Sequence, residues 1–495
     1  MNDFTYTAHL DSLLSVLDRY RGLNVWVIGD LMLDEYIAGA VERISPEAPV
    51  PVVRVRESEH RLGGAANVAR QVAALGARTT LAGLVGDDLS GAQLVRMCDT
   101  AGIDTRAVVR SGDRRTTRKL RVLGHSQQLL RLDWEDALPA SAHAAAQMLE
   151  RLTDGNWPDV IILSDYAKGV LTRETVSKIV RLRAAGAGPI VVDPKQRDFA
   201  HYRGATTVTP NLRELEAAAG RSLDPDNHPA VAAAARELAA AADLDALVVT
   251  LGERGMIVVP MDAPETHIPA VRRAVYDVTG AGDTAIAVLA LSLAAQAPLI
   301  ASAQIANAAA GVSVGEVGAI AVDAPSIRAA LAEMPASKIL AREELAARAA
   351  SWRIAGKRIV FTNGCFDLLH AGHLSLLNGA AKLGDVLVLA INSDASVRRL
   401  KGRERPLVPE GERAALLAAL TCVDAVTIFD EDTPLATLQL IKPHVLVKGE
   451  DYRLEDVVGK ELVEANGGRV ALVPLMAEKS TSALVERIRA IAASR

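Results

Sequence analysis

The segment Gly280-Ala281-Gly282-Asp283 carries the residue types best suited to chemistry in the first two-thirds of the chain. Small residues at the start of a helix let several backbone N–H groups point at one anion, and the helix dipole favours that anion. A carboxylate beside such a site would repel phosphate, unless it accepts a proton from an attacking hydroxyl group. Phosphoryl transfer needs both an anion cradle and a positioned base. The structural alternative is a glycine-rich turn capped by an aspartate.

A second pair of candidate residues, His370 and His373, follows an apolar strand at the expected start of a helix, with Gly372 between them. The glycine would let a phosphate approach the backbone N–H groups, and the imidazoles could donate hydrogen bonds as charge builds on its oxygens. Two histidines at this spacing could also bind a metal ion, but no third cysteine or histidine lies at a suitable spacing. We therefore expect a phosphate site here.

Two upstream motifs, Gly63-Gly64-Ala-Ala-Asn67 and Asn211-Leu212-Arg213-Glu214, precede Asp277–Thr284 in the order found in ribokinase-like carbohydrate kinases. The sequence resembles this family, the pfkB family, over about residues 20–335. The resemblance implies that Asp283 is the catalytic base and that residues 280–282 form an anion hole. It further implies nucleotide contacts from Asn211, Leu212, Arg213, Glu214 and Gly252, an indirect hold on Mg²⁺ by Glu214, and sugar contacts from Asp34, Gly63, Gly64 and Asn67.

A basic cluster lies where this family has a small lid over the sugar; it consists of Arg114, Arg115, Arg118, Lys119 and Arg121. Charged residues on an edge strand commonly protect against aggregation, so a solvated strand is one interpretation. The other interpretation is that the cluster, with Arg118 as the named candidate, binds a phosphate already present on the substrate. Removal of Arg118 would then weaken the binding of a phosphosugar far more than the binding of its unphosphorylated form.

The chain from about residue 357 onward resembles the nucleotidyltransferases of the cytidylyltransferase-like superfamily, whose mark is an HxGH motif after a strand. The resemblance implies that His370 and His373 stabilise the α-phosphate of a nucleotide as pyrophosphate leaves. It also implies that Lys448 and the segment Ser480-Thr481-Ser482 hold the nucleotide. A serine or threonine before a helix is also an ordinary helix cap.

Short apolar segments rich in β-branched residues alternate with helical segments, which predicts a mostly parallel sheet covered by helices. Polar residues follow several of these strands, at the end where such sheets bind ligands. We expect strands at 24–28, 160–163, 190–192, 206–208 and 246–250, and, after a break near residue 335, at 358–361, 386–391, 425–429, 445–447 and 470–473.

Together with the two resemblances, this pattern predicts an α/β protein of two domains. A ribokinase-like three-layer domain with a small lid is expected at residues 1–336, followed by a helical linker at 337–356. A smaller Rossmann-like nucleotidyltransferase domain is expected at 357–495. A length of 495 residues would allow about three domains at ~150 residues each, so the first domain is expected to be large.

The composition is that of a globular protein with ample core, because 50% of the residues are hydrophobic and 23% are charged. A net charge of −5 lacks the basic surplus of a general nucleic-acid binder. The uncharged stretch 284–315 is long enough to span a bilayer, but its alanines and polar interruptions indicate two buried helices broken near Ala297-Pro298. Three widely spaced cysteines and an N-terminus without a signal-peptide pattern indicate a cytoplasmic protein with reduced thiols.

A pfkB-type kinase followed by an HxGH transferase resembles the bifunctional family of heptose-7-phosphate kinases and heptose-1-phosphate adenylyltransferases of Gram-negative bacteria. The segments Gly29–Asp34 and Ile44–Pro51 carry the same resemblance. It implies phosphorylation of D-glycero-β-D-manno-heptose 7-phosphate at O1 by ATP. It also implies transfer of AMP from a second ATP to the heptose 1-phosphate, which gives ADP-heptose and pyrophosphate for the lipopolysaccharide core, and it implies a homodimer.

Two alternatives stay open at this point. One is another sugar or polyol kinase fused to a cytidylyltransferase, which the use of CTP in the second half-reaction would reveal. The other is a nucleotide-binding regulator with inactive sites, against which the joint presence of Asp283, Glu214, His370 and His373 speaks. We expect phosphosugars, ATP and Mg²⁺ as ligands, and neither nucleic acid nor a membrane as partner.

Overall fold

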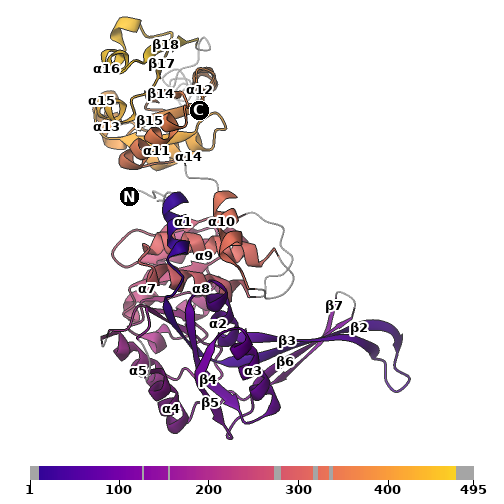
Figure 1. Cartoon of the computed structure of the whole chain (residues 1–495). Coiled ribbons are helices and arrows are strands. Elements are labelled where there is room, and N and C mark those ends of the chain that lie inside the picture. The colour runs from indigo at the N-terminus through magenta and orange to yellow at the C-terminus, as the bar shows by residue number, and fades with distance from the viewer. Residues whose placement is uncertain are drawn as a thin grey trace, which may run out of the picture. The chain divides into compact units, whose positions relative to one another are not determined.

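The computed structural model describes residues 10–124, 127–153, 157–184, 186–271, 280–315, 321–333 and 338–474. The chain separates into two compact units, one from Thr7 to Pro335 and one that contains residues 336–495. Each unit is built on its own sheets (Figure 1), and each is described by itself.

The first unit is built on a nine-stranded sheet with the strand order β13-β12-β11-β10-β9-β8-β1-β4-β5. The strands from β5 to β11 in this order pair in parallel, whereas β12 is antiparallel to β11 and β13 is antiparallel to β12. The strands are β1 (Asn24–Gly29), β4 (Arg78–Gly86), β5 (Asp104–Ser111), β8 (Val160–Ser164), β9 (Ile190–Asp193), β10 (Thr207–Val208), β11 (Ala246–Thr250), β12 (Met256–Pro260) and β13 (Thr266–Ile268).

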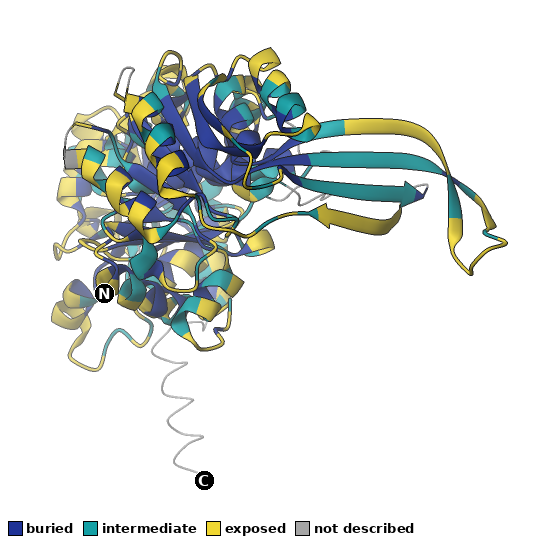
Figure 2. Cartoon of the chain, turned by 90° about the horizontal axis from the view of Figure 1, so that it is seen from below, coloured by how far each residue is buried: buried dark blue, intermediate teal, exposed yellow. Residues whose placement is uncertain are grey.

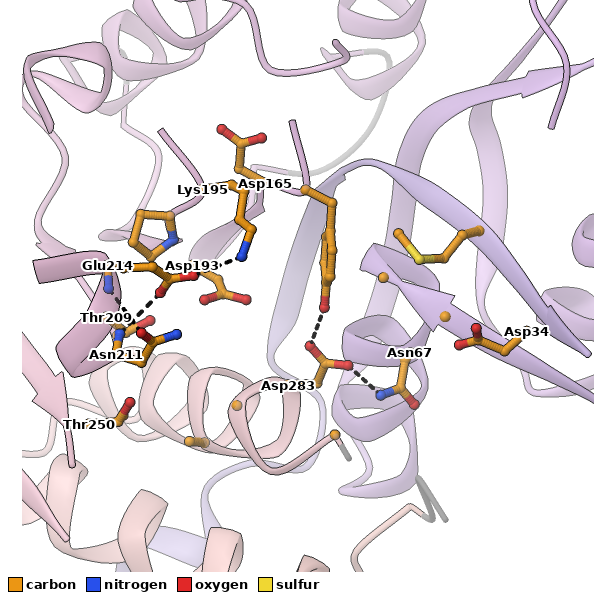
Figure 3. A pocket seen from close by; sticks show the side chains of 18 of the residues that line it. Asp34, Asn67, Asp165, Asp193, Lys195, Thr209, Asn211, Glu214, Thr250 and Asp283 are labelled. Carbon is orange, nitrogen blue, oxygen red and sulfur yellow. Dashed lines mark hydrogen bonds and ion pairs between the residues drawn. The ribbon is translucent and has the colours of Figure 1, made fainter. Parts of the chain in front are cut away.

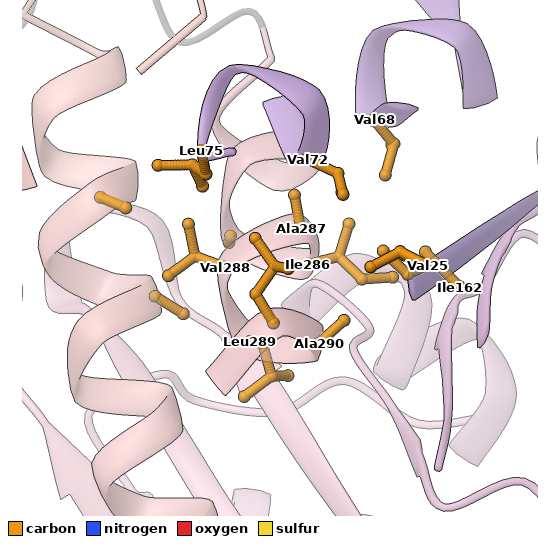
Figure 4. Close-up of a cluster of buried hydrophobic side chains, with 14 of the residues drawn as sticks. Val25, Val68, Val72, Leu75, Ile162, Ile286, Ala287, Val288, Leu289 and Ala290 are labelled. Carbon is orange, nitrogen blue, oxygen red and sulfur yellow. The ribbon is translucent and has the colours of Figure 1, made fainter. Parts of the chain in front are cut away.

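Both faces of this sheet are buried under helices. In β1, Val25 and Val27 enter one hydrophobic cluster and Trp26 and Ile28 enter the other, because alternate residues of a strand point to opposite faces. Figure 4 shows the first cluster, in which side chains of α2 and α8 meet those of β1 and β8. One layer holds α1 (Leu10–Asp18), α2 (Ala65–Ala74), α3 (Leu89–Thr100), α8 (Ala281–Ala294), α9 (Leu299–Ser313) and α10 (Ala324–Glu333); the other holds α4 (Ala142–Thr153), α5 (Arg173–Ala184), α6 (Leu212–Ala219) and α7 (His228–Ala241).

The uncharged stretch forms the two buried helices α8 and α9, as predicted. Between them Gln296 has a φ of 60°, in the left-handed region, which ends the first helix before Pro298. Among the described residues, no helix combines the length and the hydropathy that a membrane span requires.

A second sheet of the first unit has the order β3-β2-β6-β7 and forms a lid. Figure 2 shows these strands extending away from the layered body, with few buried residues toward their far ends. Only Asp30 separates β1 from β2, and β3 runs directly into α2. The strand β2 therefore starts, and β3 ends, at the carboxyl ends of the parallel strands of the main sheet. The strands are β2 (Leu31–Ile44), β3 (Pro51–Gly64), β6 (Thr117–Gly124) and β7 (Gln127–Trp134).

The second unit is built on a five-stranded parallel sheet with the order β16-β15-β14-β17-β18. The helix α11, which was expected in a linker, contributes Leu345 and Ala349 to the core of this unit. The elements are α11 (Arg342–Ile354), β14 (Ile359–Gly364), α12 (Ala371–Ala381), β15 (Val386–Asn392), α13 (Asp394–Lys401), α14 (Glu410–Ala418), β16 (Ala425–Phe429), α15 (Leu435–Ile441), β17 (Val445–Gly449), α16 (Lys460–Ala465) and β18 (Arg469–Val473). Every strand expected from the sequence overlaps a strand of the structure, and the α/β prediction is confirmed.

Candidate active sites

A cavity of about 390 Å³ lies at the carboxyl ends of the central strands of the first unit (Figure 3). Residues that follow parallel strands meet at one edge of a sheet, which is where such folds bind ligands. The polar residues that line it are Thr250 at the end of β11, Thr209, Asn211 and Glu214 after β10, Asp193 and Lys195 at and after the end of β9, Asp165 and Tyr166 after β8, Asp34, Tyr36, Arg61, Lys119 and Arg121 from the lid, Asn67 from α2 and Asp283 from α8.

Asp283 lies in the first turn of α8, and only 8% of its surface is exposed. Its Oδ2 accepts a hydrogen bond from Asn67 Nδ2 at 2.5 Å, and its Oδ1 accepts one from the Tyr166 hydroxyl at 2.9 Å (Figure 3). Burial raises the pKa of Asp283 and Asp34 adds to that rise, whereas the two hydrogen bonds and the charge of Arg70 lower it. A buried carboxylate with a neutral donor on each oxygen is suited to accept a proton from a hydroxyl group.

The start of α8 beside Asp283 is open to a ligand. Gly280 at the N-cap has a φ of 83°, a conformation that favours glycine, and no side chain caps the helix. Gly280 and Gly282 line the cavity, and Ala281 is the first helical residue. The first N–H groups of a helix have no partner within it, so they can bind an anion. Residues 277–279 of the motif lie outside the described part of the chain.

The residues predicted to contact a sugar lie together where β2 and β3 meet the main sheet. A Cβ atom on Gly63 would lie 2.5 Å from Asp34 Oδ2, and one on Gly64 would lie 2.5 Å from the carbonyl oxygen of Asp30. Only glycine permits these approaches, which explains the Gly-Gly pair. Asp34 Oδ1 accepts a hydrogen bond from Arg121 Nη1 at 2.6 Å.

Asn67, predicted as a sugar contact, lines the cavity but also serves Asp283. Arg70 Nη2 donates to Asn67 Oδ1 at 2.8 Å, and this bond turns Asn67 Nδ2 toward Asp283. The amide of Asn67 thus connects a guanidinium to the candidate base without bringing the charge into contact with it.

Three residues of the predicted basic cluster, Arg118, Lys119 and Arg121, lie on β6 and are divided between its two faces, whereas Arg114 and Arg115 precede the strand. Lys119 and Arg121 line the cavity, whereas Arg118 does not, and its guanidinium lies 3.7 Å from the ring centroid of Trp134. Side chains alternate between faces along a strand, so Arg118 points away from the side that Lys119 and Arg121 share. Burial lowers the pKa of Lys119, and Asp34 opposes that change. No hydrogen bond or salt bridge joins the ammonium group of Lys119 to another residue in the described part of the chain.

Asn211 and Glu214 form a capping box at the start of α6. Asn211 Oδ1 accepts from the Glu214 backbone N–H at 3.0 Å, and Glu214 Oε2 accepts from the Asn211 backbone N–H at 3.1 Å. Both side chains line the cavity, and Glu214 Oε1 also lies 3.1 Å from Lys195 Nζ. The motif therefore builds a helix start and presents polar groups to the cavity at once.

Three other predicted nucleotide contacts, Leu212, Arg213 and Gly252, are close in sequence to the lining residues Asn211 and Thr250. Leu212 packs against the hydrophobic core and Arg213 is exposed. Gly252, with a φ of 62°, begins a short 3₁₀ turn two residues after Thr250. None of the three lines the cavity in the described residues.

The carboxylates near Lys195 offer oxygen donors to a magnesium ion. Burial raises the pKa of Asp193 well above its usual range, the charges of Asp283 and Glu214 add to this, and Lys195 opposes it. No group of three or more His, Cys, Asp or Glu side chains in the described residues is arranged to hold a metal ion alone. Mg²⁺ commonly binds through one or two carboxylates together with phosphates and water, and the donors present fit that mode.

A second cavity, of about 460 Å³, lies at the carboxyl ends of β14, β15 and β17 in the second unit. Its polar lining consists of Asn363, Cys365, Asp367 and His373 at and after the end of β14, Asn392 from β15, Lys401 and Arg405, Asp432 and Thr433, and Lys448, Tyr452 and Asp456 at and after β17.

His373 lines this cavity from the first turn of α12, and His370 at the N-cap stacks on it with ring centroids 3.8 Å apart. Burial lowers the pKa of His373 to about 4, and His370 acts in the same direction. His373 is therefore neutral at pH 7 before a ligand binds, and its ring keeps one N–H group to donate.

Lys448 places an ammonium group in the same cavity. Its Nζ donates to the carbonyl oxygen of Asn363 at 3.0 Å and lies 5.3 Å from the ring centroid of Tyr452. Burial lowers the pKa of Lys448 to about 8, with Asp451 and Cys365 opposing. The predicted nucleotide contacts Ser480, Thr481 and Ser482 lie outside the described residues.

Sequence patterns did not single out several residues that shape the two cavities. Arg413 is 1% exposed and donates to the carbonyl oxygen of Cys365 at 2.5 Å and to Asp394 Oδ1 at 2.7 Å, so it fixes the loop after β14. Asp367 forms an ion pair with Arg405 at 2.5 Å. In the first cavity Tyr166 was missed, although it follows the polar turn at the end of β8; Asp193 and Lys195 belong to a polar turn that was noted after a predicted strand, but no specific role was predicted for them.

Comparison with known proteins supports the family predicted for each of the two units. Residues 23–327 match the pfkB family carbohydrate kinases, and residues 361–483 match the cytidylyltransferase-like family. The Bifunctional protein HldE of Pelobacter propionicus is 48% identical over 481 residues, which are 96% of this chain and 98% of that protein. The Bifunctional protein HldE of Geobacter sulfurreducens is 46% identical over 478 residues, which are 96% and 97% of the two chains.

Solved structures resemble the first unit. Phosphofructokinase-2 from Escherichia coli in complex with potassium aligns with a TM-score of 0.54 at 21% identity, over 63% of this chain and 98% of that chain. Arabidopsis thaliana ribokinase complexed with ribose and ATP aligns with a TM-score of 0.51 at 19% identity, over 63% of this chain and 99% of that chain. These likenesses confirm the predicted ribokinase-like fold.

The fold and the two cavities define a bifunctional enzyme, in which a carbohydrate kinase is joined to a nucleotidyltransferase. The prediction of these two enzyme classes is confirmed. The chain belongs to the family of Bifunctional protein HldE, whose members match it over nearly its whole length.

Proposed function

We propose that the first unit phosphorylates D-glycero-β-D-manno-heptose 7-phosphate at O1. Asp283 accepts the proton of the O1 hydroxyl as O1 forms a bond to the γ-phosphorus of ATP. The bond between that phosphorus and the β–γ bridging oxygen breaks, and ADP leaves with the bridging oxygen. Backbone N–H groups of residues 280–282 stabilise the charge on the transferred group. The product is the 1,7-bisphosphate.

The second unit then transfers AMP to the heptose 1-phosphate. A phosphate oxygen of the sugar attacks the α-phosphorus of a second ATP, the bond from that phosphorus to pyrophosphate breaks, and ADP-heptose forms for the lipopolysaccharide core. His370 and His373 donate hydrogen bonds to the α-phosphate oxygens as charge builds, and Lys448 binds the phosphates. A separate phosphatase removes the 7-phosphate between the two steps, so the intermediate leaves the first site.

The observation that supports a phosphosugar as the substrate is that two cations, Lys119 and Arg121, lie beside Asp34. Asp34 can accept hydrogen bonds from sugar hydroxyls, and Arg121 is already paired with it at 2.6 Å. Lys119 lines the same cavity, is half-buried, and has no salt bridge within the described residues. A half-buried ammonium without an ion-pair partner is suited to a phosphate on the substrate.

The substitution Lys119→Met tests this assignment against Arg118→Met on the opposite face of the same strand. Loss of one charge-assisted hydrogen bond should raise the KM for heptose 7-phosphate by about 10- to 100-fold. The KM for ATP should stay unchanged in Lys119→Met. A larger rise of the sugar KM in Arg118→Met would contradict the role of Lys119 and support Arg118 in its place.

ATP with Mg²⁺ is the proposed nucleotide in both halves. In the first unit, Asn211 and Glu214 line the cavity at the start of α6. In this proposal they contact the phosphates of the donor, and Glu214 would hold the ion indirectly. When bound, Mg²⁺ neutralises charge on the phosphates. Lys195 would exchange its ion pair with Glu214 for the nucleotide phosphates.

A cytoplasmic homodimer formed through the kinase unit is part of the same proposal. The edge strand β7 supports it, because Leu130 and Leu132 there are 52% and 39% exposed. Apolar side chains on an unpaired edge favour contact with a second copy. Light scattering should give twice the mass of 52.3 kDa, and the variant Leu130→Lys should shift the protein toward the monomer.

Phosphorus NMR tests the two reactions together. The protein with ATP, Mg²⁺ and heptose 7-phosphate should form a sugar bisphosphate and ADP. Addition of a sugar-bisphosphate phosphatase should then give a nucleotide sugar and pyrophosphate. A parallel sample with CTP should give no nucleotide sugar, and a cytidine product would overturn the assignment of ATP to the second unit.

A further inference from the structure

Two buried carboxylates bond the backbone of the loop that follows β8: Asp165 Oδ1 accepts from the Ala167 N–H at 2.7 Å, and Asp30 makes the larger number of bonds. Asp30 is 1% exposed and accepts hydrogen bonds from the backbone N–H groups of Tyr166, Lys168 and Val170, at 2.9, 2.9 and 3.1 Å. Within the loop, Ala167 has a φ of 56°, a region that residues with a Cβ atom rarely adopt. Strained backbone of this kind persists where the surroundings determine it, and it is common at functional sites.

The far side of the same loop is also held in place. Arg114 Nη2 donates to the carbonyl oxygen of Lys168 at 2.6 Å, and Lys168 Nζ pairs with Glu135 at 2.7 Å. Arg114 of the basic cluster thus supports this loop from outside the cavity lining. The side chain that the loop directs at the cavity is Tyr166, whose hydroxyl donates to Asp283 Oδ1 at 2.9 Å.

The Tyr166 phenol keeps its proton and acts as a hydrogen-bond donor. Burial and the charges of Asp283 and Asp193 raise the pKa of Tyr166 well above its usual range, so its proton stays in place. Asp283 also faces Asp34 from β2 and Arg70 from α2. Of the described side chains around Asp283, Tyr166 and Asn67 donate hydrogen bonds to its carboxylate, and both are neutral.

We propose that Tyr166 is a positioning residue for the base of the kinase site, and that Asp30 acts through Tyr166 by fixing the loop that carries it. The proposal rests on the role of Asp283 proposed above. Tyr166 and Asn67 each bind one oxygen of the Asp283 carboxylate, which holds its plane fixed. Each oxygen keeps a second lone pair, so the carboxylate can still accept the proton of a sugar hydroxyl.

The variant Tyr166→Phe removes the hydroxyl and keeps the ring. Without this donor the ionised form of Asp283 is less stable, so the acid limb of kcat/KM for the kinase reaction should move to higher pH. The expected shift is about 1 to 2 pH units, the equivalent of one hydrogen bond to a charged group. All variants are compared on the same phosphosugar, so ionisation of the substrate phosphate is common to every profile.

Tyr20→Phe is the matched control, because it removes a phenol that also bonds to α8. Tyr20 Oη and Ser292 Oγ lie 2.5 Å apart in the core, and Ser292 is nine residues from Asp283, about 14 Å along the helix. This variant should leave the limb in place. Adenylyltransferase activity, measured in the same samples, should not change in either variant.

Asp30→Asn tests the second part of the proposal. If Asp30 acts only through Tyr166, the double variant Asp30→Asn/Tyr166→Phe should have its acid limb where Tyr166→Phe alone has it. Additive shifts would overturn this part. A kinase rate that falls equally at all pH values in Tyr166→Phe, or that does not change, would overturn the first part.

Wild-type turnover of heptose 7-phosphate is measured first, which separates the two proposals. Absence of wild-type turnover would contradict the substrate proposed for the first unit. Wild-type turnover with an acid limb that Tyr166→Phe leaves unmoved would contradict the role of Tyr166 and leave the substrate assignment standing.

Discussion

Asp283, His373 and Lys448 are ionisable groups that burial pushes toward their neutral forms, and their neighbours decide the outcome. Burial raises the pKa of Asp283, but two neutral donors favour its ionised form. The neighbour of His373 is another histidine, which adds to the effect of burial and leaves the ring neutral. Lys448 keeps a carbonyl partner, and its pKa of about 8 leaves it mostly charged at pH 7. The neighbours of Asp283 and Lys448 thus oppose the effect of burial, whereas the neighbour of His373 adds to it.

The adenylyltransferase reaction should depend on pH through Lys448. Its pKa is lowered to about 8, so the ammonium is present below that pH and is lost as the pH rises through it. We expect kcat/KM to fall above about pH 8, and Lys448→Arg, which stays charged, to move this limb upward. Lys448→Met should lower kcat/KM at pH 7 by about 10- to 100-fold, as measured by pyrophosphate release. A limb that stays near pH 8 in Lys448→Arg would belong to another group.

At the level of elements, α6, α8 and α12 are among the helices that begin at a cavity. Each start adds partial positive charge and backbone N–H groups to a site whose ligands carry phosphates. The side chains around them are held by buried polar groups, Asp30 in the first unit and Arg413 in the second. The rigid elements therefore determine where charge lies, and the buried polar groups determine the shape of the loops between them.

Replacement of Arg413 should destabilise the second unit. The guanidinium is buried and its donors reach Asp394 and the carbonyl oxygens of Cys365 and Val408. Arg413→Ala should lower the free energy of unfolding by about 3–5 kcal/mol, because it leaves buried polar groups unpaired. Denaturant unfolding followed by circular dichroism should show the loss, whereas Glu412→Ala, an exposed change on the same helix, should stay within about 0.5 kcal/mol.

The strands that the sequence predicted, such as β1, β8 and β15, are buried on both faces and therefore read as continuous apolar runs. Four strands of the nine-stranded sheet, β4, β5, β12 and β13, were not predicted. The lid strands are half-exposed and polar, as in β3, so they carry no such run. The face on which Arg118 lies depends on the register of β6 against β2, where Met32 pairs with Thr117. That register joins segments about 85 residues apart, and no local pattern reveals it. The partners of Asp283 could not be predicted for the same reason, since Asn67 and Tyr166 come from distant elements.

The whole molecule consists of two units, each with its own core and its own cavity. Hydrophobic clusters of the first unit contain no residue of the second, and the reverse also holds among the described residues. The two proposed reactions are not consecutive, so neither site needs the product of the other directly.

Separate cores predict separable activities. Asp283→Asn should lower kinase turnover by about 10²- to 10⁴-fold, the usual contribution of a general base, and leave adenylyl transfer unchanged. His373→Ala should do the reverse. Both half-reactions can be followed in one sample by phosphorus NMR. Loss of both activities from either change, in a protein that circular dichroism shows to be folded, would contradict independent sites.

The order of strands in the nine-stranded sheet also acts as a gauge of length. The residues proposed to hold the nucleotide follow β10 and the sugar contacts follow β1, with β9 and β8 between them. Three strand spacings of about 4.8 Å separate the two ends, or about 14 Å. Backbone hydrogen bonds fix this distance, so the pairing of the strands sets how far the proposed nucleotide side of the cavity lies from the proposed sugar side.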